Sequence, residues 1–176
     1  MQKVLLVIVA ALVSACQSYS LGRYTPSVDN QLYLRGLAPA QINVSEFTAT
    51  TPDDKDILCV GRIYIRTQDD ETFSKFIQNA LTSELKLAGV YSPNAKTTLS
   101  GKLEHIDASY HRSQWEMTLR ITSSNGKSAT FSDVYPYHKG FYDSACMLPA
   151  QAFVPAVQDL IKKIVTSQDF KGLIQN

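Results

Sequence analysis

The chain has 176 residues, enough for one domain with a sizeable hydrophobic core. Its 17 Lys and Arg residues nearly balance its 16 Asp and Glu residues, so the formal net charge is +1. This balance gives no electrostatic reason to bind nucleic acid or an anionic membrane surface. We therefore expect no nucleic-acid partner.

The N-terminus has the layout of a secretory signal peptide. Lys3 precedes an unbroken apolar run from Val4 to Val13, and the small residues Ser14 and Ala15 follow. One basic residue, a short apolar core and small residues before a cleavage point are typical of such a signal. The run has about half the length that crosses a bilayer. Residues 1–15 are therefore predicted to be a signal peptide rather than a transmembrane helix.

The next residue, Cys16, completes a sequence that resembles a bacterial lipobox: Val13-Ser14-Ala15-Cys16, with Val13 where Leu is commoner. The resemblance implies that the Cys16 thiol receives diacylglycerol, that the chain is cut before it, and that the new amino group is acylated, for example with palmitate. Three acyl chains would anchor the protein firmly, because each buried methylene contributes about 0.8 kcal/mol and one chain alone binds only marginally. The alternative is an ordinary secretory signal in which Cys16 is incidental.

Gln17 bears on the destination of such a lipoprotein. In lipoproteins of enteric-type Gram-negative bacteria, an Asp at this position retains the protein in the inner membrane. Its absence here implies the periplasmic face of the outer membrane, if the source is Gram-negative. Residues 16–40 are polar and rich in turn-forming residues, so they are expected to be the lipidated N-terminus and a tether, with a short ordered piece at residues 32–34. Residues 41–176 are expected to form a single periplasmic domain.

Two strands are expected at the start of this domain. Residues 42–49 carry apolar side chains mainly on one parity. Residues 57–67 are apolar on both parities, which suits a central strand covered at least partly on both faces.

A helix is predicted next, ending at about Ala88, with Asp69 or Asp70 as its N-cap. Its apolar side chains recur every three or four residues and form a stripe that only Glu84 interrupts. Gly89 supplies a left-handed residue after the last turn, Val90 the hydrophobic contact that often accompanies it, and Pro93 prevents the helix from continuing.

Three strands are expected after this helix. In residues 97–109 the apolar positions change parity, which indicates a β-bulge near Glu104 and His105. Residues 114–122 alternate between apolar and polar side chains, so one face is buried. A hairpin turn at residues 123–127 leads to the last strand. A three-residue loop with Gly126 left-handed pairs Leu119 with Phe131, whereas a two-residue loop would mix apolar and polar residues on one face.

The last long segment has apolar residues at helical spacing between Ala150 and Val165. Pro149 suits a first turn, but Pro155 lies inside and is expected to kink or restart the helix. Asp169 is a candidate cap for a final turn. The predicted order is therefore β-β-α-β-β-β-α. It indicates an α+β fold, a two-layer sandwich with an antiparallel or mixed sheet of about five strands and two main helices on one face.

Cys59 and Cys146 are the cysteines other than Cys16. An even pair in an oxidising compartment favours a disulfide. Two unpaired buried thiols are an alternative. A third reading is a catalytic Cys with His105, His111 or His138 as its base, although no known local signature surrounds either cysteine.

The sequence shows no nucleophile elbow, phosphate-binding loop or metalloprotease motif, so no catalytic residue, cofactor or metal site is predicted. An aromatic cluster in the irregular stretch after the last strand is the candidate interaction surface, and it comprises Tyr135, Tyr137, His138, Phe141 and Tyr142. The alternative is that these aromatic side chains cover one end of the core.

The lipobox, the pattern Phe73-x-x-Phe76-Ile77-x-x-Ala80-Leu81 and the element order resemble small outer-membrane α+β lipoproteins of the YajG-like and LptE-like kinds. Tyr33-Leu34-Arg35-Gly36 is similar to a short stretch near the lipidated Cys of the latter. The resemblance implies a non-enzymatic accessory or binding module in envelope assembly or transport, with an envelope protein as its partner. The other hypotheses are a periplasmic hydrolase or thiol enzyme, using Cys146 or a carboxylate, and a lipid carrier, which would need an apolar cavity between sheet and helices.

Overall fold

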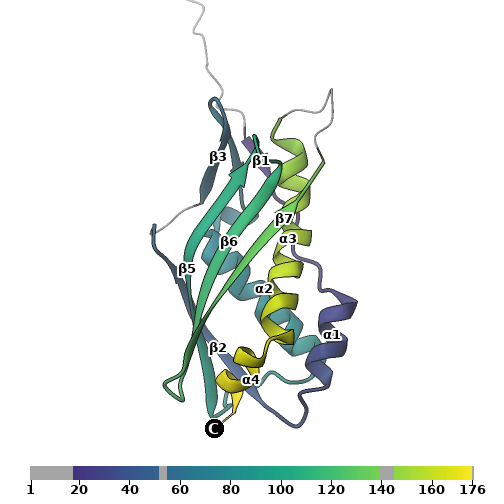
Figure 1. Ribbon diagram of the computed structural model, residues 1–176, viewed down its shortest axis with the longest axis vertical. Helices are drawn as coiled ribbons and strands as arrows, with labels where there is room; N and C mark the ends of the chain where they lie inside the picture. The colour runs from purple at the N-terminus through teal and green to yellow at the C-terminus, as the bar shows by residue number, and fades with distance from the viewer. Residues whose placement is uncertain (1–17, 52–54, 139–144, 176) are drawn as a thin grey trace, which may run out of the picture.

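The computed structural model describes residues 18–51, 55–138 and 145–175. They form an α+β fold with two sheets (Figure 1). The larger sheet has the order β2-β5-β6-β7, and its strands are β2 (Ile42–Ala49), β5 (Thr97–Ser109), β6 (Gln114–Ser123) and β7 (Ser128–Pro136). The smaller sheet has the order β1-β4-β3, with strands β1 (Ser18–Ser20), β4 (Ile63–Arg66) and β3 (Asp56–Val60). The helices are α1 (Val28–Arg35), α2 (Phe73–Ala88), α3 (Met147–Thr166) and α4 (Gln168–Ile174).

The larger sheet is mixed, because β2 runs parallel to β5 while the other neighbours are antiparallel. The predicted bulge is confirmed, since the register between β5 and β6 shifts between Leu103 and His105. The predicted hairpin register is also confirmed: Leu119 pairs with Phe131, and Gly126 has a φ of 86°. The alternation of apolar and polar residues, together with the turn residues, therefore predicts the pairing of three adjacent strands.

The helices cover one face of this sheet, with α2 against β2 and α3 against β6 and β7 (Figure 1). Between the layers lies an aromatic cluster in which the Phe153 ring is 4.8 Å from Trp115 and 5.5 Å from Phe73, measured between ring centroids. All three side chains are fully buried. The coarse prediction of a two-layer α+β arrangement is thus confirmed.

The single central strand expected at residues 57–67 is wrong. The segment is a β-hairpin, β3 and β4, that turns at Gly61 with a φ of 60°. It belongs to the separate smaller sheet rather than to the main one. Ile57 and Ile65 are buried, whereas Leu58 is 52% exposed. The segment is apolar on both parities partly because Leu58 is exposed, and not because a single strand is covered on both faces.

The tether expected up to residue 40 is also corrected from Ser18 onward. β1 pairs with β4, and α1 packs against α2 and α3. Leu21 and Leu34 are fully buried, and Tyr19, Tyr24 and Leu37 pack against the core, so apolar side chains attach this segment to the domain. The sequence does not predict these contacts, because this turn-rich segment has no periodic pattern of apolar residues.

Two details of the helix ends differ from expectation. The side chain of Thr72, rather than Asp69 or Asp70, accepts the capping hydrogen bond at the start of α2, from the backbone N–H of Lys75. At the other end Gly89 is left-handed, with a φ of 78°, as predicted. Ser167, not Asp169, caps α4 by accepting from the N–H of Phe170.

Pro155 does not divide the last long helix, because α3 continues through it from Met147 to Thr166. A proline removes the hydrogen bond to the carbonyl four residues earlier, here that of Gln151.

Candidate functional site

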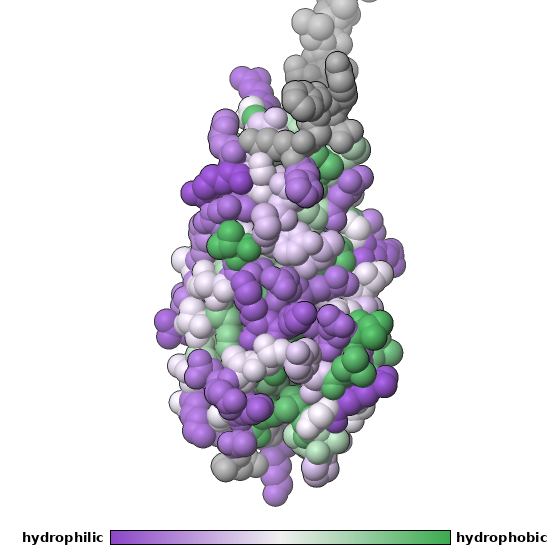
Figure 2. All heavy atoms as spheres, turned by 45° about the vertical axis from the view of Figure 1, so that its right-hand side comes forward, coloured by the Kyte–Doolittle hydropathy of each residue, from purple (hydrophilic) through white to green (hydrophobic). Residues whose placement is uncertain are grey.

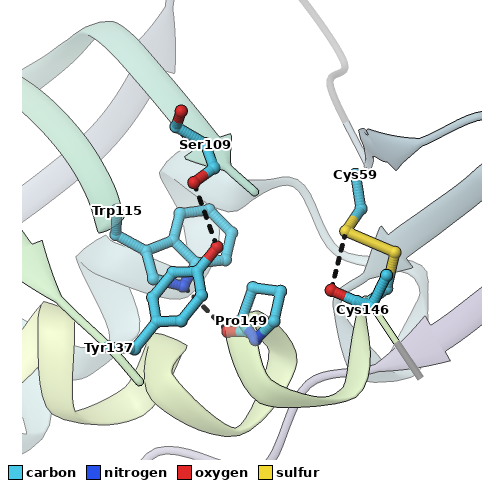
Figure 3. Close-up of a disulfide and its surroundings, with 7 residues drawn as sticks. Cys59, Ser109, Trp115, Tyr137, Cys146 and Pro149 are labelled. Atoms are coloured by element: carbon cyan, nitrogen blue, oxygen red, sulfur yellow. Dashed lines mark hydrogen bonds between the residues drawn. A yellow bond between two sulfur atoms is a disulfide. The ribbon is translucent and has the colours of Figure 1, made fainter. Parts of the chain in front are cut away.

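The predicted disulfide is confirmed: Cys59 of β3 is bonded to Cys146, which directly precedes α3, with 5.9 Å between the two Cα atoms (Figure 3). The bond joins the smaller sheet to the start of the longest helix. While it is intact, neither sulfur is a thiolate that could act as a nucleophile.

The start of α3 is also held by the larger sheet. The indole Nε1 of Trp115 on β6 donates a 2.8 Å hydrogen bond to the carbonyl oxygen of Pro149 (Figure 3). Nearby, the Tyr137 hydroxyl donates to the carbonyl oxygen of Ser109 at 3.2 Å. Burial, with smaller contributions from Asp107 and Tyr110, raises the pKa of Tyr137 to about 12. Tyr137 is therefore a neutral hydrogen-bond donor at physiological pH.

The candidate aromatic surface is described only in part, because Phe141 and Tyr142 lie outside the described residues. Tyr135 and Tyr137 are half-buried and pack against the core, whereas His138 is exposed. Both tyrosines thus have the core-covering role that the sequence left open. The signal peptide, Cys16 and its lipidation likewise lie outside the described residues and stay predictions.

A buried carboxylate holds the N-terminal segment in place. The Glu84 side chain on α2 is fully buried and accepts hydrogen bonds from the Tyr24 hydroxyl at 2.6 Å and the Ser27 N–H at 2.8 Å. The amides of Asn30, at 3.3 Å, and Gln31 also donate to it. Burial, followed by the contact with Glu84, raises the pKa of Tyr24 far above its usual range. This carboxylate therefore docks α1 and the turn before it onto α2.

Sequence reasoning missed this attachment, although it left a visible signal. Glu84 is the single charged residue in the apolar stripe of α2. A carboxylate at a core position needs several donors, and the polar residues of the supposed tether supply them.

The outer side of α1 presents hydrophobic residues to solvent. Val28 is 74% exposed, Leu32 63% and Tyr33 51%. Figure 2 shows a hydrophobic patch at the lower right, at the level of α1. A shallow hollow of about 340 Å³ is lined by Asp29, Leu32 and Tyr33. Clustered exposed apolar residues with a polar surround are typical of a protein-binding surface. We call Val28, Leu32 and Tyr33 the α1 face.

The carboxylates near the β5–β6 ladder are engaged in ion pairs. Arg120 lies 2.7 Å from Glu104, and Arg112 lies 2.7 Å from Glu116 and 3.2 Å from Asp107. His105 is 4.0 Å from Glu116 and is half exposed. Within the described ranges, no three His, Cys, Asp or Glu residues are grouped so that they could hold a metal ion.

Asp133 is a buried carboxylate at the edge strand β7, and it contacts the ammonium of Lys163 on α3. Burial raises the pKa of Asp133 above its ordinary value of 3.8, and Lys163 opposes that shift. Because the pKa is higher in the folded state, the contribution of Asp133 to stability is present at low pH and is lost as the pH rises through the folded-state pKa. An inward-pointing charge on an edge strand also discourages pairing with another chain.

We expect Lys163→Met to lower the free energy of unfolding at pH 7 by about 1–3 kcal/mol, because it leaves the Asp133 carboxylate without its cation. The loss should be smaller at pH 4, because the raised pKa of Asp133 favours uptake of a proton as the pH falls. Urea denaturation at both pH values measures it. Lys162→Met is the matched control, since its partner Asp29 is 65% exposed, and its effect should stay below about 0.5 kcal/mol. Equal losses at both pH values would contradict this account of Asp133.

Comparison with known proteins gives the fold and no family. No model of a protein family matches the chain, and no curated protein matches it. A solved structure that resembles it is the crystal structure of protein XCC0632 from Xanthomonas campestris, which carries the family designation DUF330. The likeness covers 89% of this chain and 96% of that one, with a TM-score of 0.59 and 16% sequence identity. The chain thus shares the fold of a DUF330 protein at low sequence identity.

In the part of the chain that the structure describes, no helix has the length and apolar character needed to cross a membrane.

Proposed function

We propose that the protein is a lipoprotein of the outer membrane that faces the periplasm and serves as a non-enzymatic binding module in envelope assembly or transport. The observation that carries the proposal is the sequence Val13-Ser14-Ala15-Cys16 at the end of an apolar run. A lipidated Cys16 would hold this domain at a membrane surface. Gln17, rather than Asp, supports the outer membrane as the destination.

Two features of the domain support this proposal. The Cys59–Cys146 disulfide suits an oxidising compartment such as the periplasm. The α1 face supplies exposed apolar area for a partner, and it is carried by a helix that Glu84 fixes from behind. A rigid apolar surface loses little conformational entropy on binding, so it favours recognition of another envelope protein.

Two of the alternative functions need groups or space that are already occupied in the described residues. A thiol enzyme needs a free Cys59 or Cys146, but the two are joined in a disulfide. A lipid carrier needs an apolar cavity between sheet and helices, where the rings of Trp115, Phe73 and Phe153 pack together.

Site-specific photocrosslinking in intact cells tests the proposed docking surface. A benzophenone amino acid at Leu32 should form a discrete adduct with an envelope protein. The same probe at Val134, which is 51% exposed on β7, serves as the control and should not form that adduct. Val28→Glu in the Leu32 probe strain should weaken the adduct, because a charge is costly to bury in an apolar interface. Adducts of the same yield and identity at both positions would contradict docking through the α1 face.

A further inference from the structure

The smaller sheet lies immediately next to the predicted lipid anchor. Cys16 is two residues before Ser18, which pairs with Tyr64 on β4. Two residues of fully extended chain span at most about 7 Å. Whatever course the chain takes there, the lipids attached to Cys16 would hold this end of the molecule, shown at the top of Figure 1, close to the bilayer.

The side chains next to that anchor suit a lipid headgroup region. The registers Ser18–Tyr64 and Tyr64–Leu58 place three residues in one row across β1, β4 and β3. Their neighbours Ile57 and Ile65 point into the core, so this row lies on the outward face. Leu58 is 52% exposed there, beside the half-buried Tyr64. An amphipathic tyrosine beside a leucine is well placed at a membrane–water interface.

The turn of this hairpin adds a positive charge. Arg62 follows Gly61 at the turn and is exposed. Two other cations near this sheet have acidic partners: Arg66 lies 2.6 Å from Asp56, and Lys55 lies 2.7 Å from Asp70. The ion pairs among the described residues do not include Arg62. A guanidinium in this position can bind lipid phosphate, which attracts basic residues near a membrane surface.

We propose that the β3–β4 hairpin rests on the phospholipid surface that holds the anchor, with Leu58 and Tyr64 at headgroup level and Arg62 on a lipid phosphate. This inference rests on the proposed lipidation of Cys16. The acyl chains supply the affinity, and the hairpin sets the orientation. In that orientation α1, in the lower half of Figure 1, lies at a distance from the bilayer, so the α1 face stays accessible to a partner.

The test uses the full lipidated protein reconstituted in vesicles of phosphatidylethanolamine and phosphatidylglycerol with brominated acyl chains, which quench a nearby indole. Leu58→Trp should be quenched several-fold more strongly than Leu87→Trp. Leu87 is the matched control, because it is 59% exposed on α2. The native Trp115 is fully buried and supplies a constant background. Arg62→Gln in the Leu58→Trp protein should reduce the quenching.

The outcomes separate this inference from the proposed function. Equal quenching of the Leu58→Trp and Leu87→Trp proteins, in vesicles that retain an acylated protein, would overturn the orientation and leave the lipoprotein assignment standing. A mature chain without acyl groups would overturn both. Strong quenching at Leu58 that is unchanged by Arg62→Gln would overturn the phosphate contact.

Discussion

Replacing Cys59 and Cys146 together with alanine is expected to lower the free energy of unfolding by about 4–5 kcal/mol in the chain-entropy description. The two residues are 87 positions apart, so the bond closes a long loop that the unfolded chain would otherwise leave unrestrained. Removing the disulfide should first loosen the contact between the smaller sheet and the start of α3, because the bond joins these two elements directly. Trp115 and Pro149 would still hold α3 to the larger sheet.

Urea denaturation followed by circular dichroism measures this loss, with two internal controls. Reducing the wild-type protein should reproduce the effect of the double substitution, and reducing the variant should change nothing further. Thiol labelling of the native protein without reductant should leave Cys59 and Cys146 unmodified. Two labelled cysteines would contradict the disulfide and restore the thiol-enzyme hypothesis. A loss below about 1 kcal/mol would contradict its expected contribution to stability.

Glu84→Ala should be the second severe substitution, with an expected loss of about 3 kcal/mol or more in the free energy of unfolding. It removes the acceptor for the Tyr24 hydroxyl and the Ser27 N–H. The amides of Asn30 and Gln31 lose one acceptor each and keep their bonds to the carbonyl oxygens of Gln158 and residue 84. Glu84→Gln should cost less, because its amide oxygen still accepts some of these bonds. The damage should fall on the N-terminal segment, since these donors all lie there.

Hydrogen exchange distinguishes this local effect from general unfolding. Amides of α1 should exchange faster in the Glu84→Ala protein than in the wild type. Amides of β5 and β6 should keep most of their protection. Glu46→Ala is the control, since that glutamate is exposed on β2 and its replacement should change stability by less than about 0.5 kcal/mol. Uniform loss of protection across the chain would show that Glu84 does not act on α1 specifically.

The parts of the fold that the sequence predicts well are those specified by local patterns. The alternation from Gln114 onward and the left-handed Gly126 determine the β6–β7 register without any information from distant residues. The parity change in β5 similarly reveals its bulge near His105. The stripe of α2 and Gly89 define the end of that helix in the same way.

The parts that the sequence does not predict depend on tertiary contacts. β1 has three residues and gains its partner only when β4 is folded beside it. Four residues between positions 24 and 31 donate to Glu84, a residue more than fifty positions away: Tyr24, Ser27, Asn30 and Gln31. Of the candidate sites, Cys59 and Cys146 were predictable from the expected compartment. The α1 face was not, because the sequence does not show that Asn30 and Leu34 are the buried residues of α1 while Val28, Leu32 and Tyr33 are exposed.

Intact-protein mass spectrometry of the mature chain purified from its membrane tests the central claim most directly. The account predicts a protein that begins at Cys16 and carries the added mass of a diacylglycerol and one N-linked acyl chain. Cys16→Ala should abolish this modification. A mature chain with an unmodified Cys16, or one that begins at another residue, would contradict the assignment of this protein as a lipoprotein.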